Sequence, residues 1–187
     1  MNIVVLNGSI VGSNTRVATE KVVERFKDQE NVKVTFINLA NYNLQFSDGR
    51  NYVDYDGDTK FVTERIMKAD GIVIGTPVFQ ASIPGTLKNL FDLLPVDAFR
   101  DKVVSIVMTA GSSKHYLVAE QQLKPILSYM KAQIVPTYVF IKEEDILRKE
   151  IINDDVLFRI DRLIEDTIML VEVYQEVQAK QDYEFDF

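Results

Sequence analysis

The chain has 187 residues, 28 acidic against 21 basic side chains, a formal net charge of −7 and no cysteine. The lack of cysteine excludes disulfides, thiolate metal sites and a thiol nucleophile, and the acidic balance argues against nucleic acid as a partner. This length fits one domain, residues 1–187. No apolar run approaches the roughly 20 residues of a membrane span, so we expect a cytoplasmic protein without membrane contact.

Five apolar segments predict strands, at residues 2–7, 32–38, 71–76, 102–109 and 134–140. The central segments are almost continuously apolar, which is typical of strands with helices on both faces. Helical patterns separate the strands and predict a doubly wound α/β fold, a three-layer sandwich around a five-stranded parallel sheet of order 2-1-3-4-5. Ligands of such sheets bind beyond the carboxyl ends of the strands, here at the switch point between the first and third strands.

The helical segments are predicted from apolar residues spaced three and four apart. The second of them is expected to begin at Asp58 or Thr59 and to bury Phe61. In the fourth, Pro125 lies well inside the helical pattern of residues 115–131. An interior proline removes a backbone hydrogen bond at a cost of about 3 kcal/mol. We therefore expect a kink or a widened turn before this proline.

Three further segments carry predictions about the edges of the molecule. Pro136 cannot donate to a strand ladder, which places the last strand at a sheet edge. The segment Asn38–Asp58 is long and polar, and two interpretations stay open: an ordered loop beside the ligand or at a subunit contact, and a mobile loop. Near the end of the chain we expect a long helix capped by Asn153 or Asp154. Aromatic residues in its tail, residues 178–187, suggest docking onto a second subunit.

The loop after the first strand offers hydroxyls, an amide and backbone N–H groups at the start of a helix, which together are typical of a phosphate site. An acidic chain leaves phosphate to such groups rather than to cations. The glycine spacing matches neither G-x-G-x-x-G nor G-K-[ST], which excludes the dinucleotide fingerprint and the P-loop. The structural alternative is that Ser13 or Asn14 only caps the helix. The candidate residues of this loop are Ser9, Ser13, Asn14 and Thr15.

The loops after the third and fourth strands complete the candidate site. Pro77 fixes the chain and the next residues must turn sharply, so a flat ring can lie against this loop. Gly111 allows a close backbone approach, and N–H groups aimed at a ring carbonyl would stabilise negative charge on a reduced flavin. Each loop alone fits ordinary core or a helix-opening turn; together they indicate one planar, phosphorylated ligand. The candidate residues are Pro77, Val78, Phe79, Gln80, Thr109, Ala110, Gly111 and Ser112.

The remaining polar residues favour no second site. His115 is interpreted as a residue at a helix start rather than as a catalytic base, because no G-x-S-x-G elbow or cysteine accompanies it. Two acidic groups are interpreted as solvated loop charge, with a divalent-ion site as the less favoured alternative. These groups are Asp54, Asp56 and Asp58, and Glu143, Glu144 and Asp145. No resident metal is expected.

At the three loops the chain resembles the flavodoxin-like NAD(P)H-dependent FMN reductases, most of all those that supply reduced flavin to alkanesulfonate monooxygenases. The matching residues are Gly8-Ser9 with Ser13 and Thr15, Thr76–Phe79, Gly85–Lys88, Asp92–Pro95, Thr109–Gly111 with His115, Leu123–Leu127 and Lys131–Gln133. The resemblance implies a flavodoxin-like fold, FMN with its phosphate at the first loop and its ring at the other two, and NADPH or NADH as donor. It also implies a homodimer or homotetramer and a flavin-dependent monooxygenase as a candidate partner.

The chain departs from the family pattern at several of these positions. Val11, included among the candidate cofactor-binding residues, stands near an arginine of many relatives, and Ser112 replaces a second glycine. Phe79-Gln80 replaces a common Tyr-Asn or Tyr-Lys pair. Gln121 stands where some sulfonate-linked members carry an extra tyrosine in a π-turn and hold flavin loosely. This difference favours tighter FMN retention here.

The leading hypothesis is an NAD(P)H-dependent FMN oxidoreductase that passes hydride from nicotinamide to flavin and electrons on to free flavin, a quinone, an azo compound or oxygen. The flavin N5 atom carries this chemistry, so no catalytic side chain is required. The alternative is a flavodoxin-type FMN electron carrier without NAD(P)H activity, which the acidity favours. A flavin-free interaction domain of the same fold is a third hypothesis. The sequence leaves open the acceptor, the nicotinamide preference and the assembly.

Overall fold

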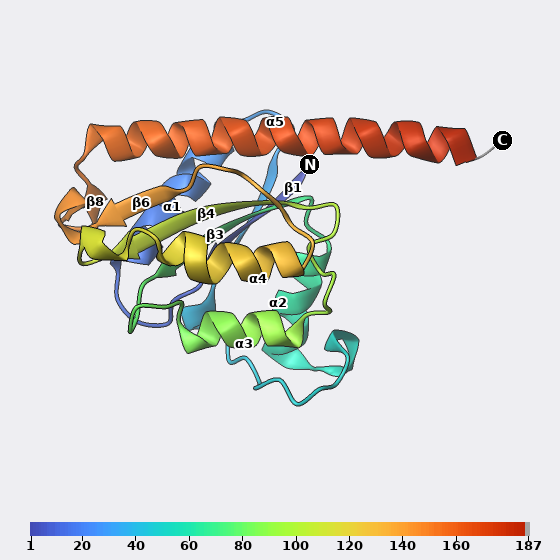
Figure 1. Cartoon of the computed structure of the whole chain (residues 1–187), viewed down its shortest axis with the longest axis horizontal. Helices are drawn as coiled ribbons and strands as arrows, with labels where there is room; N and C mark the ends of the chain where they lie inside the picture. The colour runs from blue at the N-terminus through green and yellow to red at the C-terminus, as the bar shows by residue number, and fades with distance from the viewer. Residues whose placement is uncertain (186–187) are drawn as a thin grey trace.

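The computed structural model describes the backbone of residues 1–185 and the side chains of residues 1–180. One parallel sheet has the order β2-β1-β3-β4, with the last two strands both beside β4. Its strands are β1 (Asn2–Asn7), β2 (Lys33–Asn38), β3 (Gly71–Pro77), β4 (Val103–Ala110), β5 (Gln133–Ile134) and β6 (Val139–Lys142). The predicted α/β fold and the order 2-1-3-4-5 are confirmed (Figure 1).

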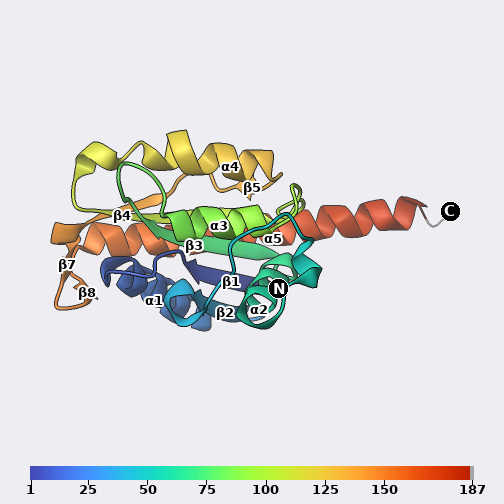
Figure 2. The ribbon, with the colours of Figure 1, turned by 90° about the horizontal axis from the view of Figure 1, so that it is seen from below.

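Helices cover both faces of the sheet, as predicted (Figure 2). Helices α1 (Asn14–Lys27) and α5 (Asp154–Phe185) pack on one face, and α2 (Gly57–Met67), α3 (Gly85–Leu93) and α4 (Lys124–Tyr129) on the other. Side chains of β1 alternate between the two layers, as a strand period of two requires: Ile3 and Val5 pack with the first layer, Val4 and Leu6 with the second.

Short elements connect these layers near the loops. They are the 3-10 helices η1 (Leu39–Asn41), η2 (Tyr52–Asp54), η3 (Ser113–His115) and η5 (Glu143–Asp145), the π-helix η4 (Ala119–Leu123), and a hairpin of β7 (Ile146–Leu147) and β8 (Glu150–Ile151). The widened turn predicted before Pro125 is therefore present as η4. Pro125 itself is the second residue of α4, directly after η4, so the widened turn lies where the proline N–H is missing.

The prediction of one fifth strand over residues 134–140 is wrong, because the structure divides this segment into β5 and β6. Pro136 lies in the break between them and has no N–H to continue the ladder. The Lys124 Nζ donates to the Pro136 carbonyl at 2.8 Å. The predicted edge position of this segment is correct, since β4 is the strand that pairs with both β5 and β6.

Two details of the predicted helices also change. Helix α2 begins at Gly57, after Asp56 as its N-cap, rather than at Asp58 or Thr59. Phe61, predicted to be buried, is 40% exposed, and its ring stacks on Tyr42 at a centroid distance of 5.6 Å. The outward position of Phe61 is therefore explained by a contact with the long loop rather than with the core.

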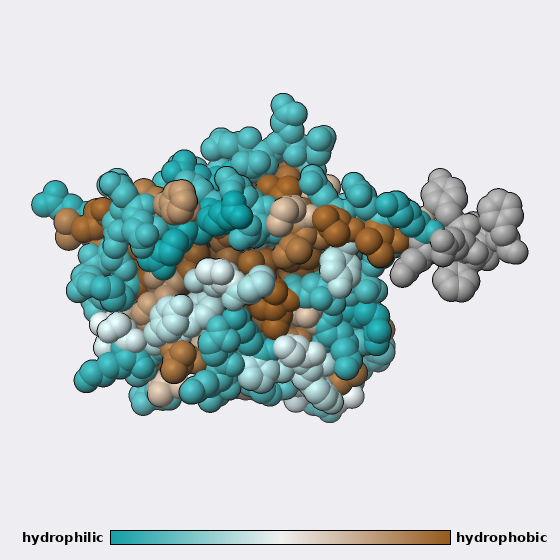
Figure 3. Space-filling view, turned by 45° about the horizontal axis from the view of Figure 1, so that its top comes forward, coloured by the Kyte–Doolittle hydropathy of each residue, from teal (hydrophilic) through white to brown (hydrophobic). Residues whose placement is uncertain are grey.

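Helix α5 extends past the end of the sheet (Figure 1). Asn153 caps it by accepting the Asp155 N–H at 3.0 Å, as predicted. Its exposed Met169, Val173 and Val177 are four residues apart, and apolar side chains gather along the helix where it leaves the sheet (Figure 3). The predicted docking of Tyr183, Phe185 and Phe187 lies outside the described side chains. Among the described residues no helix is long and apolar enough to cross a membrane.

Candidate functional site

The first loop leaves the start of α1 free for an anion. The buried Ser9 hydroxyl donates to the Val11 carbonyl at 2.6 Å and thereby closes the loop. Gly12 follows at φ +80°, a left-handed conformation that glycine adopts without strain. Ser13 occupies the N-cap position, but its side chain makes no capping hydrogen bond, and the first turn contains no acidic residue. Backbone N–H groups and the positive end of the helix dipole therefore remain available.

The second loop contains the sharp turn predicted after Pro77. Phe79 and Ser82 exchange two backbone hydrogen bonds, at 2.9 and 3.0 Å. Gln80 and Ala81 between them both have positive φ, 49° and 57°, which disfavours non-glycine residues by about 1–2 kcal/mol each. Such local strain occurs preferentially at ligand sites. The turn leaves Phe79 39% exposed at the edge of the site.

Three hydrogen bonds hold the loops together. The Gly8 N–H donates to the Gly75 carbonyl at 2.7 Å, which joins the first and second loops. The Val78 N–H donates to the Thr109 carbonyl at 2.9 Å, which joins the second and third. The hydroxyls of Thr15 and Thr109 lie 2.6 Å apart and join the first and third. The residues that follow β1, β3 and β4 therefore form one fixed unit.

This unit surrounds a pocket of about 340 Å³, here called the β1–β4 pocket. It is lined by Val11, Gly12, Ser13, Asn14, Thr15, Pro77, Val78, Phe79, Thr109, Ala110, Gly111 and Glu143. Ten of the thirteen predicted residues thus lie around one pocket. Three do not line it: Ser9 closes the first loop, Gln80 forms the turn, and the Ser112 hydroxyl accepts the Lys114 N–H at 3.3 Å.

Two lining residues, Gly12 and Glu143, were not predicted. A Cβ on Gly111 would lie 3.7 Å from the Glu143 Oε2 atom. Glu143 directly follows β6, so the rule that places the site at the carboxyl ends of the strands also covers this residue. Its neighbour Asp145 was wrongly interpreted as solvated: it is 4% exposed and accepts the Lys142 N–H at 2.8 Å. The described side chains form no group of three or more potential metal ligands.

A second pocket of about 600 Å³ shares Val11 and Phe79 with the first. We call it the apolar pocket. Its other lining residues are Ile10, Leu39, Tyr42, Asn43, Leu44, Phe46, Pro84, Gly85, Thr86 and Asn89. One wall is the long segment after β2, which is ordered and lies beside the site, in agreement with the first of its two interpretations.

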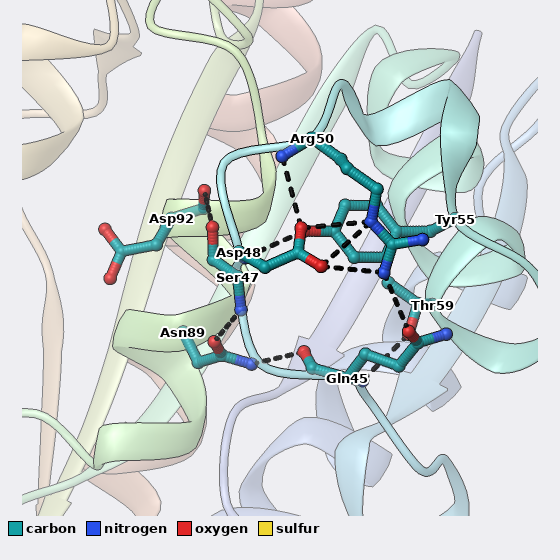
Figure 4. Close-up of polar contacts among 8 residues, drawn as sticks. All are labelled: Gln45, Ser47, Asp48, Arg50, Tyr55, Thr59, Asn89 and Asp92. Carbon is teal, nitrogen blue, oxygen red and sulfur yellow. Dashed lines mark hydrogen bonds and ion pairs between the residues drawn. The ribbon is translucent and has the colours of Figure 1, made fainter.

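Polar contacts hold this long loop against α2 and α3 (Figure 4). The Asn89 side chain donates to the Gln45 carbonyl at 2.9 Å and accepts the Ser47 N–H at 3.0 Å. Farther along, Asp48 accepts from the Tyr55 hydroxyl at 2.8 Å and from the Arg50 guanidinium. The guanidinium and the tyrosine hydroxyl hold the pKa of Asp48 well below its usual range.

The β1–β4 pocket fits a flavin mononucleotide. The start of α1 and its hydroxyls suit a phosphate, and the strained turn and the end of β4 suit the edge of a flat ring. A parallel sheet of order 2-1-3-4-5 with such a pocket at its switch point defines a flavodoxin-like, flavin-binding fold.

Comparisons with known proteins identify the family. The family model described as NADPH-dependent FMN reductase matches residues 1–145, and the chain belongs to this family. It is 39% identical over 165 residues to an NAD(P)H-dependent FAD/FMN reductase of Geobacillus thermodenitrificans, covering 87% of this chain and 89% of that protein. It is 30% identical over 146 residues to the NADH-dependent FMN reductase SfnE of Pseudomonas putida, covering 78% of each.

A solved structure agrees with this assignment. An oxidoreductase from Corynebacterium diphtheriae has a TM-score of 0.75 and 28% identity, over 91% of this chain and 97% of that one. The predicted family, the oxidoreductase class and the use of FMN with NADPH or NADH are thereby confirmed. The family model and the relatives favour the reductase hypothesis over the electron-carrier alternative.

Proposed function

We propose that the β1–β4 pocket binds FMN with its phosphate at the start of α1 and its ring between the turn at Phe79 and the end of β4. The observation that carries this proposal is the beginning of α1, which has neither a side-chain cap nor an acid in its first turn. Glu143 supports the orientation, because its carboxylate lies beside Gly111 and would repel a phosphate there. The uncharged ring therefore belongs at that end.

The residues of the chain bind and orient rather than react. Bound FMN supplies hydride chemistry at its N5 atom, which needs no protein acid or base when the nicotinamide lies against the ring. Thr15 and Thr109 fix the spacing of the phosphate loop and the ring loop through their hydroxyl contact. Backbone N–H groups near Gly111 would donate to a ring carbonyl and offset the repulsion between Glu143 and negative charge on the ring. Free flavin, a quinone, an azo compound or oxygen is the proposed acceptor.

The test is aerobic NADH and NADPH consumption by the purified chain after any bound flavin has been removed, with and without added FMN. FMN-dependent consumption is expected, and its absence would refute the enzyme proposal. Gln121 lies in the π-helix η4, and we propose that FMN is held more tightly here than in relatives with a tyrosine at this place; a bound cofactor and a loosely held substrate are the two outcomes that the next measurement separates. Gel filtration measures this retention, since a yellow protein fraction is expected after the free flavin has been removed.

We further propose one domain over residues 1–187 that acts in the cytoplasm as a homodimer or homotetramer, with a flavin-dependent monooxygenase as candidate partner. The apolar side chains of α5 at Met169, Val173 and Val177 support self-association, because they are exposed in one chain at helical spacing. Sedimentation velocity tests this proposal. Val173→Glu should weaken the assembly, whereas Val96→Glu, at a similarly exposed valine outside α5, should not.

A further inference from the structure

The apolar pocket has the size and lining of a small-molecule site. Its volume of about 600 Å³ lies in the usual range for such sites. None of its described lining side chains is charged, and three are aromatic, those of Tyr42, Phe46 and Phe79. Phe46 and Ile10 are 85% and 51% exposed at its edge. A bound apolar molecule would remove this surface from water, which is favourable at about 25 cal/mol per Å².

The wall that presents Phe46 is fixed in place. The residues on either side of Phe46, Gln45 and Ser47, are both hydrogen-bonded to the Asn89 side chain of α3 (Figure 4). The Ser47 hydroxyl also donates to the Asp92 carbonyl at 2.9 Å. These hydrogen bonds fix the backbone on both sides of Phe46, so the loop that carries this side chain is already in place. Little ordering is therefore needed when a ligand binds, which favours affinity.

One side of the pocket offers hydrogen-bond donors. Helix α3 has nine residues and starts after Pro84 without a side-chain cap or an acid in its first turn. Gly85 and Thr86 in that turn both line the pocket, and a Cβ on Gly85 would meet no atom within 4 Å. The first N–H groups of a helix have no partner within the helix and suit an acceptor oxygen. The lining of this pocket is mainly apolar and lacks the cluster of Ser13, Asn14 and Thr15 at the start of α1, so a neutral carbonyl fits better here than a carboxylate or phosphate.

We propose that the apolar pocket is a second binding site, for planar uncharged aromatic carbonyl compounds of the quinone type. The ring would lie among Tyr42, Phe46 and Phe79, with a carbonyl oxygen toward the N–H groups of Gly85 and Thr86. Since Val11 and Phe79 line both pockets, the compound would bind beside the proposed FMN position. The proposal concerns binding, which is measurable without FMN or nicotinamide and therefore stands or falls separately from the proposed function.

The test is a calorimetric titration of the full flavin-free chain with menadione, a naphthoquinone. Gly85→Leu should fill the pocket and weaken binding at least about tenfold. Leucine is tolerated in a helix and Gly85 has no positive φ, so folding should be unaffected. Ile10→Trp tests the opposite wall. Its matched control is Ile152→Trp, because Ile152 is 55% exposed against 51% for Ile10 and lies outside the pocket.

Wild-type affinity for menadione, loss in both pocket variants and no loss in the control would support the proposal. Binding weaker than about 1 mM by the wild type would overturn it, and so would equal binding by the folded pocket variants. Tighter binding of laurate than of menadione would refute the class of ligand. Failure of FMN to bind while menadione binds as described would refute the proposed function and leave this site intact.

Discussion

Replacing Asn14 by aspartate should change protein stability and ligand affinity in opposite directions. Asn14 lies in the first turn of α1, lines the β1–β4 pocket and has no acidic neighbour in that turn. A carboxylate at a helix start stabilises the helix by about 0.3–1 kcal/mol. The flavin-free Asn14→Asp variant should therefore unfold at the same or a slightly higher urea concentration than the wild type. The same carboxylate would repel a bound phosphate.

The size of that repulsion follows from the position of Asn14 in the lining. For a phosphate charge about 5 Å from the new carboxylate, and an effective dielectric constant between about 20 and 80, each pair of unit charges repels by about 1–3 kcal/mol. The expected loss of FMN affinity is thus about 5- to 150-fold for each unit of phosphate charge. Quenching of FMN fluorescence during titration measures this loss directly.

Two controls separate charge repulsion from damage to the pocket. Riboflavin lacks the phosphate, so its affinity should be the same for Asn14→Asp and the wild type. Asn31→Asp adds the same charge beyond the far end of α1, about 20 Å away at 1.5 Å per residue. That distance exceeds the Debye length of about 8 Å, so this variant should bind FMN normally. Unchanged FMN affinity in Asn14→Asp, or equal losses for riboflavin, would refute the phosphate position.

Three further predictions concern packing and hydrogen bonds within the chain. Gly75→Ala should lower the free energy of unfolding by about 1–3 kcal/mol in urea, because its Cβ would lie 2.1 Å from the Thr19 Cγ2 atom. Thr167→Val should destabilise by about 1–3 kcal/mol, more than Ser105→Ala, because the buried Ser105 hydroxyl, 2.5 Å from Thr167, loses its acceptor. Asp48→Asn should speed amide hydrogen exchange in the long loop. In the wild type, hydrogen bonds from Arg50 and Tyr55 lower the pKa of Asp48. The stabilisation that its carboxylate gives the loop is therefore fully present above the ordinary pKa of 3.8 and is lost as the pH falls below that value.

Each of these outcomes can fail in a recognisable way. Wild-type stability of Gly75→Ala would mean that Thr19 moves aside without cost. A larger effect for Ser105→Ala than for Thr167→Val would reverse the assigned direction of their hydrogen bond. Slow exchange in Asp48→Asn at neutral pH would show that the remaining contacts of the loop, at Gln45 and Ser47, suffice to hold it.

The sheet was predictable because its central strands are buried on both faces and therefore read as continuous apolar runs. The break in the fifth strand was not, although Pro136 is visible in the sequence. A proline shows that one N–H is missing, but not that the chain leaves the ladder between Ile134 and Val139 and then returns to β4. Phe61 was misplaced for a related reason, since its partner Tyr42 comes from an irregular loop without periodicity.

The β1–β4 pocket was largely predictable, because parallel strands bring the loops that follow them to one edge. Side-chain direction was not: Ser9 turns its hydroxyl back into its own loop. The apolar pocket was not predicted at all. Its wall depends on contacts such as Asn89 with Gln45, which are 44 residues apart and leave no local pattern in the sequence.

The broken fifth strand also affects how the molecule behaves in a crowded solution. A long open margin of a sheet carries a row of unused peptide groups onto which a strand from a foreign chain can add. Here the sheet edge consists of two short strands, β5 with two residues and β6 with four. Between them, the Lys124 Nζ already donates to the Pro136 carbonyl. An invading strand finds few consecutive partners there, so this side of the molecule resists the edge-to-edge growth that begins fibrils.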